Sequence, residues 1–303
     1  MIAIFEQVFI LIIFCLAGYV LSKVKLVDPS HSKTLSVLLT YVFLPCVSFN
    51  TFSAQFTPAY LLDKGPLILV STGLISVVVL VAKLINRFLT KEPYEKAVNE
   101  YSMSMANIAY MGYPLAEGVF GSAVLLDCMM FALPMTIYIG TVGFNMLTAG
   151  KEKKSLLKKI FTPSLIGILI GCAVGISGIK LPDVIYEISQ KAGACMAPAS
   201  MLITGMTISC FSIKELLKNK TVYVICAVRL LLAPLLVFGL LKLFGLEFAL
   251  TAGVVLYAMP CGMNTIVYPQ LVGKDCRLGA ATVLVSTALS MLTIPLCLYF
   301  LLL

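Results

Sequence analysis

Ten long apolar segments divide the chain, and each is close to the length that a helix needs to cross a bilayer. The apolar runs are continuous rather than alternating with polar residues, which predicts membrane-spanning helices and not the strands of a β-barrel. The segments lie at about 5–22, 34–53, 65–86, 97–117, 122–147, 160–178, 184–210, 220–241, 246–271 and 279–301. We therefore expect an all-α membrane protein with ten transmembrane helices.

The basic residues between these segments divide unevenly between the two sides of the membrane. The loops after the first, third, fifth, seventh and ninth segments hold 17 Lys and Arg, and the opposite side holds 4. Cytoplasmic loops are enriched in basic residues, so we expect both termini to lie outside the cytoplasm, in a plasma membrane of bacterial inner-membrane type. Glu6 precedes the first apolar stretch, at about 7–22, and Lys23 and Lys25 follow it, which is the reverse of the charge order of a cleavable signal peptide.

The composition excludes most soluble classes of protein. The chain is 60% hydrophobic and only 12% charged, whereas a soluble domain carries about 25% charged residues. This charge content argues against a soluble enzyme, a nucleic-acid-binding protein and a disordered chain. The ten cysteines include no CxxC pair, and HExxH and GxSxG are absent, so we expect no metal, no cofactor and no catalytic residues.

Two short motifs recur at a constant spacing of 155 residues. VKLVD at 24–28 is matched by IKLPD at 179–183, and YPLAEG at 113–118 is matched by YPQLVG at 268–273. Each half has five segments, so the second half enters the membrane upside down, as in many secondary transporters; chance similarity between Leu- and Ile-rich stretches is the alternative. The expected domains are a first five-helix repeat at 1–149, a basic cytoplasmic linker at 150–159 and an inverted second repeat at 160–303.

The fourth and ninth segments occupy equivalent places in the two halves, and both contain residues that interrupt helices. We expect the breaks at Gly112, Pro114, Pro260 and Pro269, because proline lacks an amide donor and clashes with the preceding turn. Matching discontinuous helices indicate a midplane substrate site whose helix N-termini suit a carboxylate; ordinary kinks are the alternative. The expected substrate-binding residues are Ala106, Asn107, Ile108, Tyr110, Pro260, Cys261, Gly262, Asn264 and Thr265.

Three ionisable residues lie within or at the ends of apolar segments, where charges are costly and often functional. Arg229 lies about ten residues into the eighth segment, Asp127 about five residues into the fifth, and Glu117 ends the fourth. Anion attraction is one hypothesis for Arg229, and coupling to protons is one for Asp127 or Glu117. The alternative is that all three are paired or solvated for structural reasons.

Four stretches of the sequence resemble the auxin efflux carrier family, which includes plant PIN-type auxin exporters and bacterial permeases for malate, malonate and related acids. They are AGYVLSKVKLVDPSHSKTLSVLLTYVFLPCVSF, MANIAYMGYPLAEGVFG, APASMLITGM and AMPCGMNTIVYPQLVG, and the resemblance extends over nearly the whole chain. It implies two inverted five-helix repeats and the fold of bile acid and sodium symporters. It also implies a scaffold of helices 1, 2, 6 and 7, a transport domain of the other helices, and a homodimer.

Within this resemblance, Asn107 matches the site asparagine of the fourth helix, and Pro260 matches the proline at the crossing point of the ninth. PIN-type members have proline directly before that asparagine, whereas this chain has Ala106. We therefore expect a less sharp break in the fourth helix, through Gly112 and Pro114. The loop between the halves is much shorter than in many plant members, which argues for a compact bacterial-type protein and against auxin as its substrate.

The sequence thus predicts a secondary transporter that moves a small organic anion, a mono- or dicarboxylate, through a lipid bilayer by elevator-type alternating access. The alternatives left open are an exporter of auxin-like indole acids, a symporter coupled to Na⁺ or H⁺ and, more distantly, an ion channel. A channel needs a continuous polar lining. A receptor needs a soluble domain, and an intramembrane enzyme needs a nucleophile–base pair. None of these stands out in the sequence.

Overall fold

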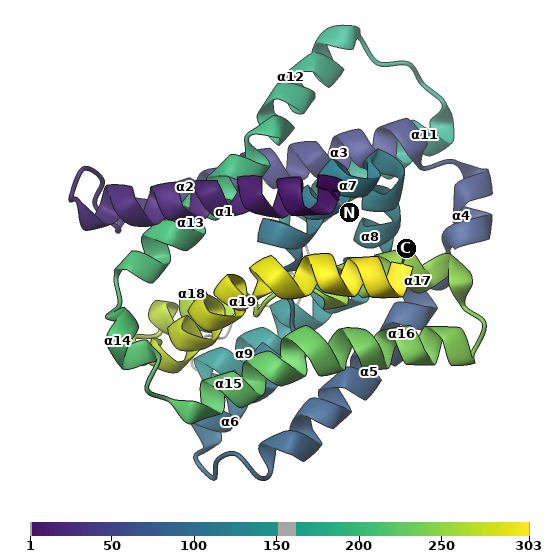
Figure 1. Ribbon diagram of the computed structural model, residues 1–303. Helices are drawn as coiled ribbons and strands as arrows, with labels where there is room; N and C mark the ends of the chain where they lie inside the picture. The colour runs from purple at the N-terminus through teal and green to yellow at the C-terminus, as the bar shows by residue number, and fades with distance from the viewer. Residues whose placement is uncertain (1, 151–161, 303) are drawn as a thin grey trace.

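The computed structural model describes residues 2–150 and 162–302. In these residues the regular secondary structure is helical, except for an isolated antiparallel bridge between Ala106 and Cys261. Figure 1 shows the helices stacked as a bundle of long rods, with the two termini both on the right of the view. Apart from Gly150, the predicted basic linker lies outside the described residues.

Within the described residues, seven helices are long and apolar enough to cross a membrane, and several of them are built from successive elements. They are α1 (Ile2–Lys23), α2 with η1 and α3 (His31–Leu38, Leu39–Phe43, Leu44–Gln55), α4 with α5 (Pro58–Lys64, Pro66–Asn86), α8 with η3 and α9 (Ser122–Tyr138, Ile139–Gly143, Phe144–Thr148), α12 with α13 (Asp183–Ala194, Met196–Ser209), α15 with η4 and α16 (Lys220–Ala227, Val228–Leu232, Ala233–Leu243), and α19 (Arg277–Leu302).

The remaining helices are shorter. They are α6 (Pro93–Ser104), η2 (Ile108–Gly112), α7 (Tyr113–Phe120), α11 (Pro163–Ser177), α14 (Ile213–Leu216), η5 (Glu247–Ala249), α17 (Leu250–Tyr257) and α18 (Asn264–Leu271). Of these, α11 and the run from η5 through α17 are apolar. The structure therefore agrees with an all-α membrane protein, while the count of ten crossings stays a prediction.

Local sequence accounts for where several helices begin. Proline stands in the first turn of α4, α5, α6 and α11, where its missing amide would have no intrahelical acceptor. Thr57 and Thr162 cap α4 and α11, because their side chains accept hydrogen bonds from the amides of Tyr60 and Leu165. The chain thus marks these helix starts with ordinary local chemistry.

Three long helices contain a wide π-helical turn directly before a proline. The turns η1, η2 and η4 are each followed by a helix whose second residue is proline, namely Pro45, Pro114 and Pro234. Proline leaves a carbonyl of the preceding turn without its partner and pushes it outward, and a wider turn accommodates that displacement. These prolines therefore bend helices without ending them.

Glycine brings two pairs of helices into close contact. Helix α1 packs on α13, and α3 packs on α11. A Cβ atom added at Gly18 or Gly205, or at Gly167, Gly171 or Gly175 of α11, would lie under 3.0 Å from a backbone oxygen of the facing helix. Small residues at such contacts let helices in a membrane pack backbone against backbone.

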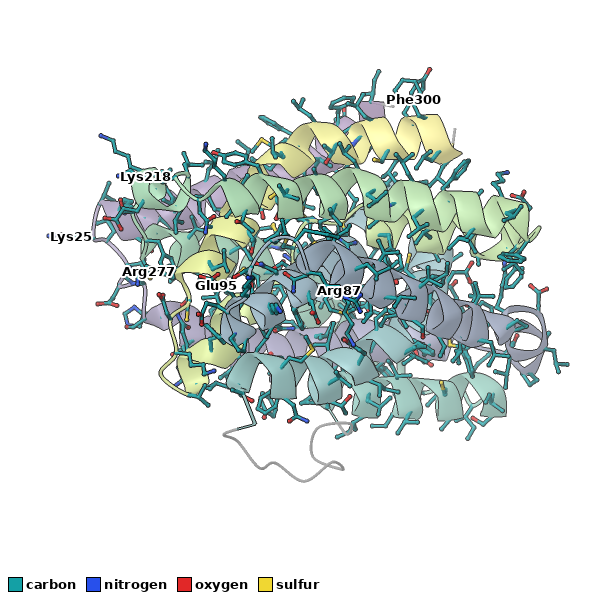
Figure 2. All side chains as sticks on the ribbon, turned by 90° about the horizontal axis from the view of Figure 1, so that it is seen from below. Lys25, Arg87, Glu95, Lys218, Arg277 and Phe300 are labelled. Atoms are coloured by element: carbon teal, nitrogen blue, oxygen red, sulfur yellow. The ribbon has the colours of Figure 1, made fainter. Side chains whose placement is uncertain are left out.

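The surface of the bundle is apolar around its sides and charged at its ends. Phe9, Leu69 and Phe300 are more than half exposed, which is unfavourable in water and favourable against lipid. Figure 2 shows Lys25, Lys218 and Arg277 near one end of the molecule and Phe300 near the other. This distribution is the one that a multi-pass membrane protein needs.

We predict that Gly205→Val destabilises the protein, because the new side chain would collide with the backbone at Cys15. Overpacking of this kind costs about 1–3 kcal/mol, and we expect a lower midpoint of thermal unfolding in detergent. Gly73→Val is the matched control, since nothing lies within 4 Å of a Cβ at Gly73. An equal midpoint for the two variants would contradict the close contact of α1 with α13.

Candidate functional site

The helix of the fourth apolar segment breaks at residues 105–107. Helix α6 ends at Ser104, Met105 is extended (φ −104°, ψ 122°), and Asn107 is also non-helical (φ −78°, ψ 65°). The chain then stays helical from Ile108 to Phe120 through η2 and α7. The expectation of a break at Gly112 and Pro114 is therefore wrong, because the π-helical turn before Pro114 absorbs the proline and keeps the helix continuous.

The ninth apolar segment breaks at residues 258–263, around Pro260. Helix α17 ends at Tyr257 and α18 begins at Asn264. Pro269 lies inside α18 and does not interrupt it. The break therefore lies at Pro260 and not at Pro269, which stands in the last turn of α18 with only two helical residues after it.

The two broken segments pair with each other, and we call residues 105–107 together with residues 258–263 the crossover. The amide of Asn107 donates to the carbonyl of Pro260 (2.8 Å), and the amide of Gly262 donates to the carbonyl of Met105 (3.2 Å). The bridge between Ala106 and Cys261 lies between these two bonds. Each break thus supplies hydrogen-bond partners for backbone groups that the other leaves without a helix.

Further contacts hold the crossover in a narrow space. The amide of Cys261 donates to Oγ of Ser286 on α19 (3.0 Å). A Cβ atom at Gly262 would lie 3.3 Å from the carbonyl oxygen of Ala106, and one at Gly112 would lie 3.2 Å from Leu256. Glycine at these two positions therefore allows the segments to cross without a side chain between them.

Arg229 fills the side of the crossover where helices α6 and α17 end. Its Nε donates to the carbonyl of Met259 (3.0 Å), and its Nη1 donates to the carbonyl of Ser104 (3.1 Å). Its Nη2 donates to the carbonyls of Tyr257 (2.8 Å) and Leu256 (3.5 Å). The guanidinium group also lies over the ring of Tyr257, 5.3 Å from its centre.

The opposite side of the crossover carries the starts of η2 and α18. The first amides of η2 have no acceptor among the described residues, whereas the amides of Thr265 and Ile266 in α18 donate to the carbonyls of Gly262 (3.3 Å) and Met263 (2.9 Å). Asn107 precedes η2 and is 3% exposed, and no hydrogen bond to its side chain occurs within the described residues. Asn264 begins α18 and donates to the hydroxyl of Tyr101 (2.9 Å). Ser200 of α13 donates to the carbonyl of Tyr110 (2.7 Å), so this side of the crossover contacts α13.

Most of the expected substrate-binding residues come together here. The crossover contains Ala106, Asn107, Pro260, Cys261 and Gly262. Ile108 begins η2, Tyr110 lies within the same turn, and Asn264 and Thr265 begin α18. Thr265 is fully buried and donates to the carbonyl of Gly262 (3.0 Å). The structure thus places all nine residues within one turn of the break, without showing that they bind a substrate.

Glu117 lies away from the crossover, near the far end of α7. It lines a cavity of about 340 Å³ together with Asn50, Gln55 and Gln190. The cavity lies between α3 and α12 on one side and α7 on the other. Its polar walls distinguish it from the apolar exterior of the bundle.

Asp127 has partners that hold the connector helix α4. The hydroxyl of Tyr60 donates to Asp127 (2.6 Å), and Nζ of Lys64 lies 3.7 Å from the same carboxylate. Tyr60 and Lys64 both belong to α4, which joins α3 to α5. These contacts give Asp127 a structural role, and no described contact links it to the crossover.

Several residues that support the crossover were not expected from the sequence. Tyr101, Ser200 and Ser286 each make a hydrogen bond to a crossover residue or its neighbouring turn. The available signal was weak, because a single hydroxyl in an apolar segment usually bonds within its own helix. Ser200 stands beside Pro198 in the APAS run, where packing was the simpler explanation.

The comparison with family models decides the class of protein. The model described as "Membrane transport protein" matches residues 3–298. The chain belongs to this family. The match covers nearly the whole chain, and it confirms the resemblance to auxin efflux carriers. The protein is therefore a multi-pass membrane transporter and not an enzyme.

Curated relatives of this transporter match along most of their length. An "Uncharacterized transporter" of Methanocaldococcus jannaschii is 27% identical over 304 residues, 96% of each chain. Another, of Methanothermobacter thermautotrophicus, is 24% identical over 297 residues, also 96% of each chain. A "Putative malonate transporter" of Rhizobium meliloti is 25% identical over 277 residues, 88% of this chain and 85% of the relative.

We predict that Asp127→Asn lowers stability and leaves the pH dependence of transport unchanged. A hydrogen bond to a charged group contributes about 1.5–3 kcal/mol, and partial exposure of this pair reduces the expected loss to about 1 kcal/mol. The measurement compares thermal midpoints of Asp127→Asn, Tyr60→Phe and the double variant, whose effects should not add. Loss of pH-dependent transport in Asp127→Asn would instead indicate proton coupling.

Proposed function

We propose that this protein is a secondary transporter of small organic carboxylates, of which malonate is the first candidate. The substrate class agrees with the relative named as a malonate transporter. It also agrees with the chemistry of the crossover, where the uncapped start of η2 presents amide donors in a buried setting.

The observation that carries the proposal is the state of Asn107. Asn107 is 3% exposed beside the start of η2, and its side chain neither caps that helix nor bonds to any described residue. An amide without a protein partner is free to donate to a ligand, and a carboxylate oxygen is a strong acceptor for it. We therefore assign Asn107 the central donor role, with the amides that follow it in η2 and Asn264 at the start of α18 completing the site.

The proposed architecture is an inverted repeat of five helices in each half, with ten crossings. The bridge between Ala106 and Cys261 joins positions 155 residues apart, the spacing at which the sequence motifs recur. Its two hydrogen bonds, 107 to 260 and 262 to 105, exchange under the same spacing. The contact of α1 with α13 and of α11 with α3 exchanges in the same way, as a two-fold axis in the membrane plane requires.

We propose that transport follows an elevator-type cycle. Helices α1 to α3 and α11 to α13 would form the scaffold, and the crossover would move against them with α5 to α9 and α15 to α19. The polar cavity lined by Glu117 supports this division, because it lies where α7 faces α3 and α12. Connector α4, held by Asp127, would be one of the segments that accommodate the movement.

The coupling ion and the oligomeric state are separate parts of this proposal. Uptake of radiolabelled malonate into proteoliposomes distinguishes the alternatives. Competition by indole acetate tests auxin-like indole acids, exchange of Na⁺ for K⁺ tests Na⁺ coupling, and a comparison of two pH values tests H⁺ coupling. Saturable exchange of internal for external malonate is the expected result for a carrier, whereas ohmic single-channel current would favour a channel. The homodimer stays a prediction from the family resemblance.

We predict that Asn107→Ala abolishes malonate binding, and that Asn107→Asp does the same although its side chain has the same shape. Alanine removes the donor, and aspartate replaces it with a charge that repels the anion. Binding is measured with radiolabelled malonate on purified protein, with thermal midpoints as the check of folding. Ser102→Ala is the matched control, because Ser102 lies on α6 before the break and bonds to Thr282 of α19. Wild-type affinity in folded Asn107→Ala would contradict the proposed site.

We predict the orientation of the loops from the distribution of basic residues. In a background without the exposed Cys195 and Cys210, Lys180→Cys should react with a membrane-impermeant maleimide on intact cells. Lys25→Cys should react only after the membrane is opened, because its loop is expected in the cytoplasm. Labelling of Lys25→Cys on intact cells would overturn the predicted orientation of both termini.

A further inference from the structure

We propose that Arg229 is a fixed cation of the crossover. Its guanidinium group holds together the ends of α6 and α17, and it gives the site without substrate one net positive charge. One carboxylate of the substrate neutralises this charge. This inference rests on the proposed function. Arg229 lies outside the starts of η2 and α18, where the substrate is proposed to bind.

The depth of Arg229 makes its charge significant. It lies nine residues after the start of α15, which places it about 14 Å along the helix, near the middle of a hydrocarbon core about 30 Å thick. Its side chain is 0% exposed. A charge at this depth is costly and cannot reach the interface by extending its side chain.

In the part of the chain that the structure describes, no carboxylate pairs with Arg229. Glu117 lines the polar cavity, and Asp127 bonds to α4. All acceptors of the guanidinium group are backbone carbonyls, from Ser104, Leu256, Tyr257 and Met259.

These carbonyls belong to the C-terminal ends of two helices, which decides the charge balance. A helix end carries a partial charge of roughly 0.5, negative at the C-terminus and positive at the N-terminus. The ends of α6 and α17 therefore supply about one negative charge beside Arg229. The starts of η2 and α18 supply about one positive charge on the opposite side. Arg229 cancels the negative ends, so the positive side remains uncompensated until an anion arrives.

The geometry explains why the residue is arginine. A guanidinium group has five N–H donors in a planar fork, whereas an ammonium group is a compact point charge. Here the three nitrogens reach one carbonyl of α6 and three carbonyls at and beyond the end of α17. Lysine would keep the charge at this position but could not hold both helix ends in the same way.

The experiment measures binding of three probes of equal size and different charge: malonate, its monoamide and its uncharged diamide. Wild-type protein should bind malonate and the monoamide, and should bind the diamide at least about tenfold more weakly, as loss of a charge-assisted contact predicts. Equal binding of the diamide would overturn the inference without any variant. Failure of the wild type to bind any carboxylate would overturn the proposed function instead.

The variants separate the charge of Arg229 from its position. Arg229→Gln should weaken malonate binding about 10- to 100-fold and leave binding of the diamide unchanged. Arg229→Lys should keep the preference for anions but lower the thermal midpoint. Lys242→Gln is the matched control, because it removes one charge from the same helical run, where Lys242 pairs with Glu247 at the surface, and should bind like wild type.

A rescue experiment covers the case in which Arg229→Gln does not fold. Arg229→Ala leaves a space among the four carbonyls that methylguanidinium fits, and adding this cation should restore both the thermal midpoint and malonate binding. Restoration by methylguanidinium but not by methylammonium supports the inference. Wild-type malonate affinity in folded Arg229→Gln, or a rescued midpoint without rescued binding, would overturn it.

Discussion

The architecture depends on satisfying two interrupted backbones in a medium that offers no water. An unpaired amide or carbonyl costs several kcal/mol in hydrocarbon, so a single broken helix would be excluded from the centre of a membrane. Two breaks side by side remove the problem, because Asn107 bonds Pro260 and Gly262 bonds Met105. Glycine at 262 and at 112 keeps the crossing narrow, and Ser286 supplies the acceptor for the amide of Cys261. The chain can therefore be broken here only in a pair, because each break satisfies the backbone groups of the other.

The helical architecture could be predicted from the sequence, because the length of an apolar segment is a strong signal for a membrane helix. Continuous apolar runs predicted helices, and the structure places helices in all ten runs, interrupted at 105–107 and 258–263. Pro260 marked one half of the crossover, since proline cannot continue a helix there. The other half was misplaced at Gly112 and Pro114. A proline near the start of a helix can be absorbed by a π-helical turn, and this depends on the space around the helix, which the local sequence does not encode.

The break at Ala106 was hidden for a related reason. Alanine is the best helix former, so local propensity favours a helix through 106, and the extended conformation is imposed by pairing with Cys261. The hydrogen-bond partners of Arg229 could not be predicted from the sequence either, because every residue has a backbone carbonyl. Burial of a charge in an apolar segment could suggest a function for Arg229, but only the fold shows that it bonds to helix ends rather than to an acid.

The symmetry of the crossover and the asymmetry of its charge follow from one arrangement. The backbone pairing exchanges the two halves at a spacing of 155, yet the position equivalent to Arg229 is Leu74, a buried apolar residue of α5. One guanidinium group reaches the ends of both α6 and α17 because those ends meet beside the axis. A second arginine would add a second charge in the hydrocarbon without a second set of carbonyls to receive it. A symmetric backbone therefore accommodates one charge near its axis, and under the proposed function an anion bound on the other side of that axis would complete the balance.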